Sequence, residues 1–372
     1  MTQEPKIFPY IERLLQGAEV VWKPLGEVAE IGTGSSNRQD EDDLGEYPFY
    51  VRSKNILRSS SYQFDETAII IPGEGGIGDI YHYVEGKYAL HQRAYRVHLL
   101  DENILSKFLF HYMRACFKEY IIFKSVGATA TSIRKPMLEK FQIPLPPLSV
   151  QQEIVRILDK FTQLEAELEA ELDYRKRQYE YYRNKLLSYE GNEVEWKTLD
   201  QISENLDSKR QPITSGLRTS GKIPYYGASG IVDYVEDYIF DGDFLLISED
   251  GANLLARNTP IAFSVSGKIW VNNHAHILKF RTYEERRFIE FYLNKTDLTP
   301  YISGAAQPKL NKKNLNSIKI PIPPLEEQQR IVTILDKFDT LVNSISEGLP
   351  KEIALRRKQY EYYREKLLSF PS

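Results

Sequence analysis

Three short motifs in this sequence resemble catalytic or nucleotide-binding signatures. GEGGIG at 73–78 matches the G-x-G-x-x-G pattern, in which the helix after the glycines binds a phosphate. The segment that follows, DIYHYVEGKYAL, is typical of a strand, so we interpret the glycines as a turn. SGK at 266–268 lacks the upstream glycine and the following Ser or Thr of a P-loop, and SIRK at 132–135 has S-x-x-K form without an associated base motif. These motifs predict no catalytic site.

The histidines and the single cysteine show no pattern typical of a metal site. His274 and His276 alternate on an expected strand, and successive strand side chains point to opposite faces, which favours a structural or base-contacting role over a shared metal. Cys116 has no second cysteine to pair with, and no Cys/His cluster has zinc spacing. With no run of about 18 apolar residues for a membrane span, we expect a soluble protein of the reducing cytoplasm without a structural metal.

Several polar loops carry the side-chain types that contact DNA bases. Arg and Lys reach guanine N7 and O6, Asn and Gln pair with adenine, and small residues or backbone N–H groups bind phosphates. For any one loop taken alone, an ordinary solvated loop is the more frequent case. Matching loops in the two halves, SVGATATSIRK and SGAAQPKLNKK, strengthen the interpretation for that pair. The candidate DNA-contacting residues are Ser36, Asn37, Arg38, Gln39, Arg52, Lys54, Asn55, His91, Gln92, Arg93, Arg134, Lys135, Lys209, Arg210, Gln211, Arg218, Asn253, Arg257, Asn272, Asn273, His274, Gln307, Lys309, Asn311, Lys312 and Lys313.

Charge is distributed unevenly along the chain. The net charge of -4 and the pI of about 6.0 argue against a free-standing nucleic-acid binder, because phosphate affinity comes from clustered Lys and Arg. EAELEAELD (165–173) is strongly acidic, whereas SKRQPITSGLRTSGK (208–222) and KLNKKNLNSIK (309–319) contain only basic charges. DNA binding would therefore need this local positive charge or the charge of a partner.

The chain contains two copies of one plan. IPLPPLSVQQEIVRILDKF (143–161) returns as IPIPPLEEQQRIVTILDKF (320–338), and RKRQYEYYRNKLL (175–187) returns as RRKQYEYYREKLL (356–368). The second copy carries four extra residues between these phrases, about one helical turn, so the same helix face returns to the same side. Each copy is predicted to be a variable globular segment followed by a shared helix.

The shared helices carry an apolar seam of coiled-coil type. Ile154, Ile157 and Phe161 begin a series that steps by three and four along the first helix. Off this seam lie Tyr181 and Tyr362, which would be exposed unless a partner covers them. A helix from about 149 to 188 would be roughly 60 Å long and would act as a spacer. The residues predicted for the coiled coil or for subunit docking are Tyr179, Tyr181, Tyr182, Leu186, Tyr360, Tyr362, Tyr363 and Leu367.

We expect an α+β fold in which two β-rich mixed domains are joined by two long antiparallel spacer helices, with approximate two-fold symmetry. ETAIIIPG, KYALHQRAYRVHLL, DGDFLLIS and KIWVNNHAHILKF are typical of strands, and SKFLFHYMRACF and EERRFIEFYLNK of helices. Residues 9–22 weakly resemble the end of the spacer helix, which would make the plan nearly circular. The predicted regions are an N-terminal helical stub (1–21), a first domain (22–146), a central spacer helix (147–190), a second domain (191–323) and a C-terminal spacer helix (324–372) interrupted near 348–350.

Taken together, these phrases resemble the specificity subunits of type I restriction-modification systems. Each half opens near W-K-x-L at Trp22 or Trp196, closes on IPLPP or IPIPP, and continues into L-x-x-QQ-x-I-V-x-I-L-D-K-F and the tyrosine phrase. The likeness covers both repeats. It implies two target-recognition domains, each reading one part of a split, asymmetric site on double-stranded DNA, with the helices fixing the gap.

The resemblance also implies a division of labour among subunits. This chain would have no catalytic activity, no metal and no cofactor of its own. Two modification subunits would bind S-adenosylmethionine and methylate adenine, and a restriction subunit would use ATP and Mg²⁺ to translocate and cleave DNA. Two alternatives stay open from the sequence: a specificity subunit that serves methylation only, and a coiled-coil adaptor whose globular ends bind proteins.

Overall fold

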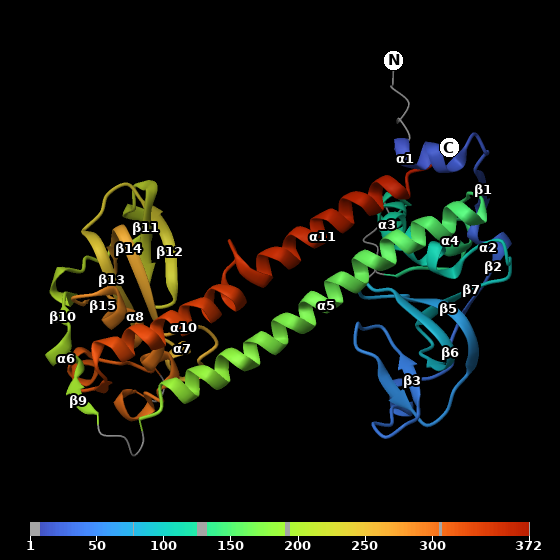
Figure 1. The fold of residues 1–372 in the computed structure, drawn as a ribbon. Helices are drawn as coiled ribbons and strands as arrows, with labels where there is room; N and C mark the ends of the chain where they lie inside the picture. Colours follow the sequence, from blue (N-terminus) through green and yellow to red (C-terminus); the bar gives the residue numbers. More distant parts are fainter. Residues whose placement is uncertain (1–7, 77, 125–131, 190–193, 305–306, 372) are drawn as a thin grey trace. The chain divides into compact units, whose positions relative to one another are not determined.

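The computed structural model describes residues 8–76, 78–124, 132–189, 194–304 and 307–371 (Figure 1). The chain divides into two compact units. Unit 1 consists of residues 1–169 and 352–372, and unit 2 of residues 170–351. Each unit therefore contains one β-rich domain together with parts of the long helices.

The domain of unit 1 is built on a six-stranded sheet with the strand order β2-β7-β5-β6-β3-β4. All neighbouring strands are antiparallel except β3 and β6, which are parallel. The strands are β2 (Ala29–Thr33), β3 (Tyr47–Tyr50), β4 (Leu57–Ser59), β5 (Phe64–Pro72), β6 (His82–Leu90) and β7 (Ala94–Leu99).

The domain of unit 2 repeats this topology strand for strand. Its sheet has the order β10-β15-β13-β14-β11-β12, and its one parallel pair, β11 with β14, corresponds to β3 with β6. The strands are β10 (Glu204–Asn205), β11 (Ser220–Gly227), β12 (Gly230–Val235), β13 (Phe240–Ser248), β14 (Ala262–Val271) and β15 (Ala275–Lys279). Two domains with little sequence in common thus share one fold, as the duplication predicts.

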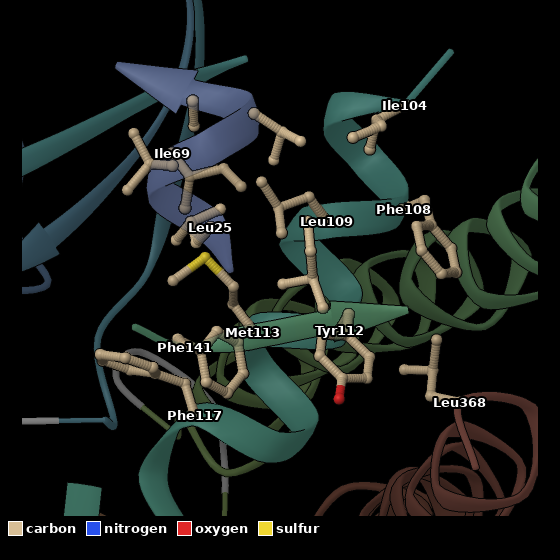
Figure 2. Close-up of a cluster of buried hydrophobic side chains, with 14 of the residues drawn as sticks. Leu25, Ile69, Ile104, Phe108, Leu109, Tyr112, Met113, Phe117, Phe141 and Leu368 are labelled. Carbon is tan, nitrogen blue, oxygen red and sulfur yellow. The ribbon is translucent and has the colours of Figure 1, made fainter. Parts of the chain in front are cut away.

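Both faces of each central strand are buried, which explains why β5 and β13 end in apolar runs. Ile69 and Ile71 face helix α3 (Ser106–Lys124), and Figure 2 shows Ile69 beside Leu109 and Met113 of that helix. Ile70, the residue between them, lies in a separate cluster on the opposite face. In unit 2 the corresponding helix is α8 (Tyr283–Lys295). Each sheet is therefore covered on one face by a helix and closed on the other by aromatic and aliphatic side chains.

A two-stranded ladder joins the beginning of each domain to its end. β1 (Val21–Pro24) pairs with β8 (Gln142–Leu145), and β9 (Glu195–Thr198) pairs with β16 (Lys319–Ile322). Trp22 lies opposite Pro144 and Trp196 opposite Pro321, so the W-K-x-L and I-P-x-P phrases of each repeat contact each other directly. The short helices of the domains are α2 (Leu25–Val28), α4 (Lys135–Glu139), α6 (Leu199–Ile202), α7 (Asn253–Ala256) and α9 (Lys312–Asn316), with 3-10 turns at Arg38–Asp40, Asp207–Lys209, Ser215–Leu217 and Thr299–Tyr301.

The first glutamine of the QQ pair in each repeat fastens the long helix to the residue that follows this ladder. The side chain of Gln151, 1% exposed, donates to the Pro146 carbonyl at 2.9 Å, and Gln328 donates to the Pro323 carbonyl at the same distance. A buried amide must find such partners, because an unpaired one costs about 1–3 kcal/mol. The first glutamine of each QQ is therefore a structural residue.

The long helices follow the predicted repeat, with one shift at the interruption. The first is α5 (Leu148–Leu186), and the second is divided into α10 (Leu325–Asn343) and α11 (Gly348–Leu367). The sequence predicts an interruption near 348–350; in the structure α10 ends at Asn343 and α11 begins at Gly348, so the break lies at 344–347, just before the glycine. Gly348 has φ +72°, and a Cβ there would lie 2.4 Å from the Thr340 carbonyl oxygen, so the break requires glycine. Pro350 lies in the first turn of α11, where a missing N–H has no cost.

The tyrosine phrases pack on the LDKF phrases in both units. In unit 1 the ring of Phe161 lies 6.4 Å from that of Tyr360 and 5.5 Å from that of Tyr363. Further along α5, Glu165 pairs with Arg357, which lies earlier in α11, so these segments run antiparallel. In unit 2 Phe338 repeats the arrangement with Tyr179 at 6.3 Å and Tyr182 at 5.6 Å. The predicted seam is confirmed in both units.

The N-terminal helix α1 (Pro9–Leu15) packs beside the end of the chain within unit 1. Ile11 and Leu15 share a hydrophobic core with Leu367 and Leu368. Nearby, the Trp22 indole N–H donates to the Pro371 carbonyl at 2.8 Å. Of the predicted helical stub at 1–21, residues 9–15 are helical, and residues 1–7 lie outside the described residues. Across the described residues, no helix is both long enough and apolar enough to span a membrane.

Candidate DNA interface

In unit 1, loops that are distant in sequence meet around the turn 91–93, which connects β6 to β7 and lies beside the end of β5. The backbone N–H of Ser36 donates to the Leu90 carbonyl at 3.2 Å, and that of Gln92 donates to the Ser36 carbonyl at 2.9 Å. The Gln92 side chain also contacts Asn37, which caps the short turn at 38–40. Two of the predicted base-reading loops, 32–40 and 90–95, are thus held together.

A carboxylate organises the cations of this surface. Glu74, directly after β5, accepts a hydrogen bond from Arg93 at 2.7 Å and also pairs with Arg52. The Arg93 hydrogen bond lowers the pKa of Glu74 below its ordinary value. Burial lowers the pKa of the adjacent His91, and the positive charges of Arg52 and Arg93 act in the same direction. The GEGGIG segment that contains Glu74 is a turn followed by a strand, as expected, although its Ile77 lies outside the described residues.

Unit 2 repeats this arrangement with different residues. The N–H of His91 donates to the Tyr50 carbonyl at 2.9 Å, and the N–H of Asn272 donates to the Tyr226 carbonyl at 3.0 Å. These bonds make the turn 91–93 equivalent to 272–274. At the third position of the second turn, His274 Nδ1 lies 2.8 Å from Asp250, as Arg93 lies beside Glu74.

The predicted single strands around these turns are each two strands. KYALHQRAYRVHLL contains the end of β6, a turn and β7, and KIWVNNHAHILKF contains the end of β14, a turn and β15. His274 lies in the turn and His276 on β15, so the expectation that both alternate on one strand is wrong. The side chains of a strand alternate between its two faces, but this alternation does not apply to His274, because the strand ends before the turn. The two histidines consequently have different environments.

A basic segment docks beside the carboxylate in each unit. The N–H of Ile133 donates to the Gly73 carbonyl, and the N–H of Leu310 donates to the Glu249 carbonyl, both at 2.7 Å. These bonds place Arg134 and Lys135 of unit 1 on the side of Glu74, and Asn311 to Lys313 of unit 2 on the side of Asp250. Residues 125–131 and 305–306 of the paired loops lie outside the described residues.

The basic segment is tethered a second time by a side chain from the sheet. The Tyr95 hydroxyl donates to the Ile133 carbonyl at 3.3 Å, and at the equivalent place His276 Nε2 lies 2.7 Å from the Leu310 carbonyl. Because a carbonyl can only accept, this Nε2 carries a proton. Sequence reasoning did not identify Tyr95 as part of the interface.

His276 belongs to a buried charge network in unit 2. Its Nδ1 lies 2.6 Å from Asp207, and Arg210 pairs with Glu249 at 2.7 Å. Burial alone would raise the pKa of Asp207, but the His276 hydrogen bond and the positive charges outweigh burial and hold it below its ordinary value. Lys309 extends the network to the surface through Glu249 at 3.2 Å. Arg210, a candidate DNA contact, thus has a structural role.

Other candidates are occupied within their own domain. The Asn253 side chain closes the loop 253–259 with two hydrogen bonds of 3.0 Å to the backbone of Thr259. Arg257 donates to the Thr296 carbonyl at 2.9 Å. Arg218 pairs with Asp233 at 2.9 Å and lies over a tyrosine ring. Ser36, His91 and Asn272 are buried. The contacts and burial of these residues indicate that they stabilise the loops of their own domain.

Asn311 is half-buried and caps α9, where its side chain accepts from the Asn314 N–H at 3.0 Å, and the remaining candidates are exposed. Arg38 pairs with Glu41 at 3.4 Å and Lys135 with Glu139 at 3.7 Å. Among the described residues, Lys54, Arg134, Lys209, Lys312 and Lys313 make no ion pair, so their charge is available to a phosphate. The other exposed candidates are Gln39, Asn55, Gln211, Asn273 and Gln307.

Sequence reasoning also missed Glu74 and Asp250, which orient the exposed cations of the turns. Each carboxylate follows an apolar strand by two residues, and this common position was the available signal. Within the described part of the chain, no three His, Cys, Asp or Glu residues are placed to hold a metal ion.

The exposed face of the tyrosine phrase is repeated on α5 and α11. Tyr181 is 59% exposed and Tyr362 is 52% exposed, each packed edge-on against the next tyrosine at 5.3 Å. In unit 1, Tyr362 lies in an open groove of about 380 Å³. The groove is lined by Glu352, Leu355, Arg356, Lys358, Gln359, Tyr362 and Tyr363.

The fold and both repeats match one family. The model of the type I restriction modification DNA specificity domain matches residues 18–174 and 192–355. The chain therefore belongs to this family and is a type I restriction-modification DNA specificity subunit with two copies of the domain.

Relatives match along the full length. The chain is 33% identical to the EcoR124I/EcoR124II specificity subunit of Escherichia coli, with 97% of each chain covered, and 32% identical to the EcoprrI specificity subunit, with 91% and 92% covered. A crystal structure of a type I S subunit from M. genitalium has the same fold, with a TM-score of 0.65, 19% identity, and 96% of this chain and 98% of that chain covered.

Proposed function

We propose that each recognition domain of this chain reads one half of a bipartite, asymmetric DNA site for a type I restriction-modification enzyme. The observation that carries the proposal is the pair of equivalent surfaces: one hydrogen-bonded frame, repeated in both domains, presents Arg93 in one and His274 in the other. A shared frame with different exposed side chains is what two readers of different half-sites need.

The exposed lysines support a DNA ligand despite the acidic pI. In unit 2, Lys312 and Lys313 are the first two residues of α9, on the side of Asp250. In unit 1, Arg134 and Lys135 occupy the matching place at the start of α4. Such cations supply phosphate affinity and fix the register of a domain on the duplex. Net charge does not oppose this, because the acids of the chain are concentrated elsewhere, for example on α5.

The long helices would set the spacing of the two half-sites and dock the modification subunits. α5 has 39 residues and so a length of about 58 Å. Tyr181 and Tyr362 are the exposed aromatics that a partner helix would cover.

Catalysis and cofactors would belong to the partner subunits. The modification subunits would bind S-adenosylmethionine and methylate adenine, and the restriction subunits would use ATP and Mg²⁺. This chain would act as the non-catalytic reader, in the cytoplasm.

Methylation mapping tests the proposal. The full chain is co-expressed with the modification subunits from neighbouring reading frames in a host that lacks DNA methylation, and the methylated adenines are mapped by sequencing. We expect a bipartite motif with two unrelated halves. Methylation without any motif, or a motif with one half only, would contradict the proposal. Absence of a restriction gene beside the modification genes would indicate a system that serves methylation alone.

A further inference from the structure

The turns 91–93 and 272–274 hold their third residue in the same way. The Arg93 N–H donates to the His91 side chain at 3.0 Å, and the His274 N–H donates to the Asn272 side chain at 2.8 Å. The accepting residues are buried, whereas the side chains of Arg93 and His274 are 57% and 51% exposed. The fold thus fixes the backbone of each turn and leaves one side chain directed outward.

In each domain, a carboxylate that follows the neighbouring strand holds this outward side chain in place. Glu74 after β5 lies 2.7 Å from Arg93 Nη1, and Asp250 after β13 lies 2.8 Å from His274 Nδ1. An exposed contact of this kind contributes little stability, whether the carboxylate faces the charged Arg93 or a neutral His274, so its use here is orientation. A side chain held in place loses less freedom when it binds a base edge.

The two side chains offer opposite hydrogen-bond chemistry. The guanidinium of Arg93 has five N–H donors and no acceptor, and one nitrogen faces Glu74. Its remaining donors match guanine N7 and O6. In the neutral ring of His274, the proton lies on Nδ1 because the Asp250 carboxylate can only accept. Nε2 then carries a lone pair, which accepts from an amino group such as adenine N6 or cytosine N4.

We propose that Arg93 and His274 are equivalent specificity-determining residues, which contact one base in the first and in the second half-site respectively. Arg93 selects a guanine, and His274 selects a base with an amino group in the major groove. The two half-sites then differ because equivalent positions of the two domains carry different side chains, Arg93 in one and His274 in the other. This inference rests on the proposed function and deepens it.

The competing role is a phosphate contact. A cation on a phosphate strengthens binding to every sequence alike, whereas a base contact changes the ratio between sequences. The measurement that separates the two roles is therefore the ratio of the affinity for the cognate duplex to the affinity for a duplex with one base changed.

The test begins from the methylation motif of the wild-type chain. The purified complex of the full chain with its modification subunits is bound to the cognate duplex and to duplexes with each single-base change. For Arg93→Ala we expect discrimination at one guanine of the first half-site to fall roughly ten- to a hundredfold, with ratios in the second half-site unchanged. His274→Ala should give the reverse pattern.

Lys118→Ala is the matched control, because Lys118 is an exposed cation paired with a loop carboxylate, Asp79, at 2.6 Å in the same domain. It should change no ratio. An equal loss of affinity of Arg93→Ala for all duplexes, or unchanged ratios, would overturn the inference. If Arg93→Ala does not fold, Arg93→Lys keeps the charge without the two-pronged contact and is judged by the same ratios. Failure of the wild-type chain to direct a bipartite motif would instead refute the proposed function.

Discussion

The two recognition domains hold their basic segments by different chemistry at one place in the fold. In unit 1 the tether is a neutral hydrogen bond of 3.3 Å from the half-buried Tyr95 to the Ile133 carbonyl. In unit 2 it is a 2.7 Å contact from the fully buried His276, which also pairs with Asp207. The fold preserves the position of the segment, while the residue that holds it has changed. Position and chemistry can therefore be tested separately.

The largest expected effect is the loss of the buried tether. His276→Phe keeps an aromatic ring, although a somewhat larger one, but leaves Asp207 without its partner, so unit 2 should lose about 3–5 kcal/mol of its free energy of unfolding. Tyr95→Phe removes one neutral hydrogen bond and should cost unit 1 about 1 kcal/mol. Denaturant unfolding, together with hydrogen exchange at the Leu310 and Ile133 amides, measures both. Equal costs would show that the two tethers are energetically alike.

The second expected effect is a pH dependence of the buried tether in unit 2. Because the folded state lowers the pKa of Asp207, its contribution to stability is present above the unfolded pKa near 4 and is lost as the pH falls through the folded pKa. The stability difference between wild type and Asp207→Asn should be largest near neutral pH and shrink below about pH 4. A difference that stays constant from pH 6 to pH 3 would contradict the ion pair.

A smaller effect is expected from the basic segment itself. Lys312→Ala with Lys313→Ala should weaken DNA binding and reduce the slope of log affinity against log salt by up to about 0.9 per lysine. Lys279, exposed at the end of β15 and outside the basic segments, serves as the control. Salt titrations of the complex measure the slopes. An unaltered slope for the double variant would exclude these lysines from phosphate contacts.

The smallest effect on the isolated chain is expected at the exposed tyrosines. Tyr181→Ala and Tyr362→Ala should change the free energy of unfolding by no more than about 0.5 kcal/mol, because both side chains lie off the packed seam. Tyr179→Ala, at a side chain only 8% exposed, should cost about 3 kcal/mol. If the docking proposal is correct, the exposed-site variants still lose affinity for the modification subunits in a pull-down. Full retention of binding would remove these tyrosines from the docking surface.

The helices were predictable because their signals are local. The three-and-four spacing that includes Phe161 and Tyr179 follows from the period of an α-helix, and Gly348 with Pro350 marks an interruption in any context. The interruption lies a few residues earlier than expected because Gly348 begins the next helix.

The candidate interface was only partly predictable, because its parts meet through the sheet. The loops 32–40 and 90–95 were identified by composition, but nothing local indicated that Glu74 orients Arg93 or that Tyr95 holds Ile133. Candidates such as Arg210 and Arg257 have the residue type of a DNA contact and are used inside the domain instead. Residue type alone does not distinguish these uses, since both need a hydrogen-bond donor.

The sequence by itself determined the duplication, the helical seams and the kinship of the two halves, because repeated phrases and helical periods are properties of a linear chain. Only the tertiary structure decided which residues of the unlike domains are equivalent. Loops of different length shift the numbering between the copies, so that Arg93 matches His274 and Glu74 matches Asp250 at different offsets. Their equivalence is fixed by the hydrogen-bonded ladders of the two sheets, which join residues far apart in the chain.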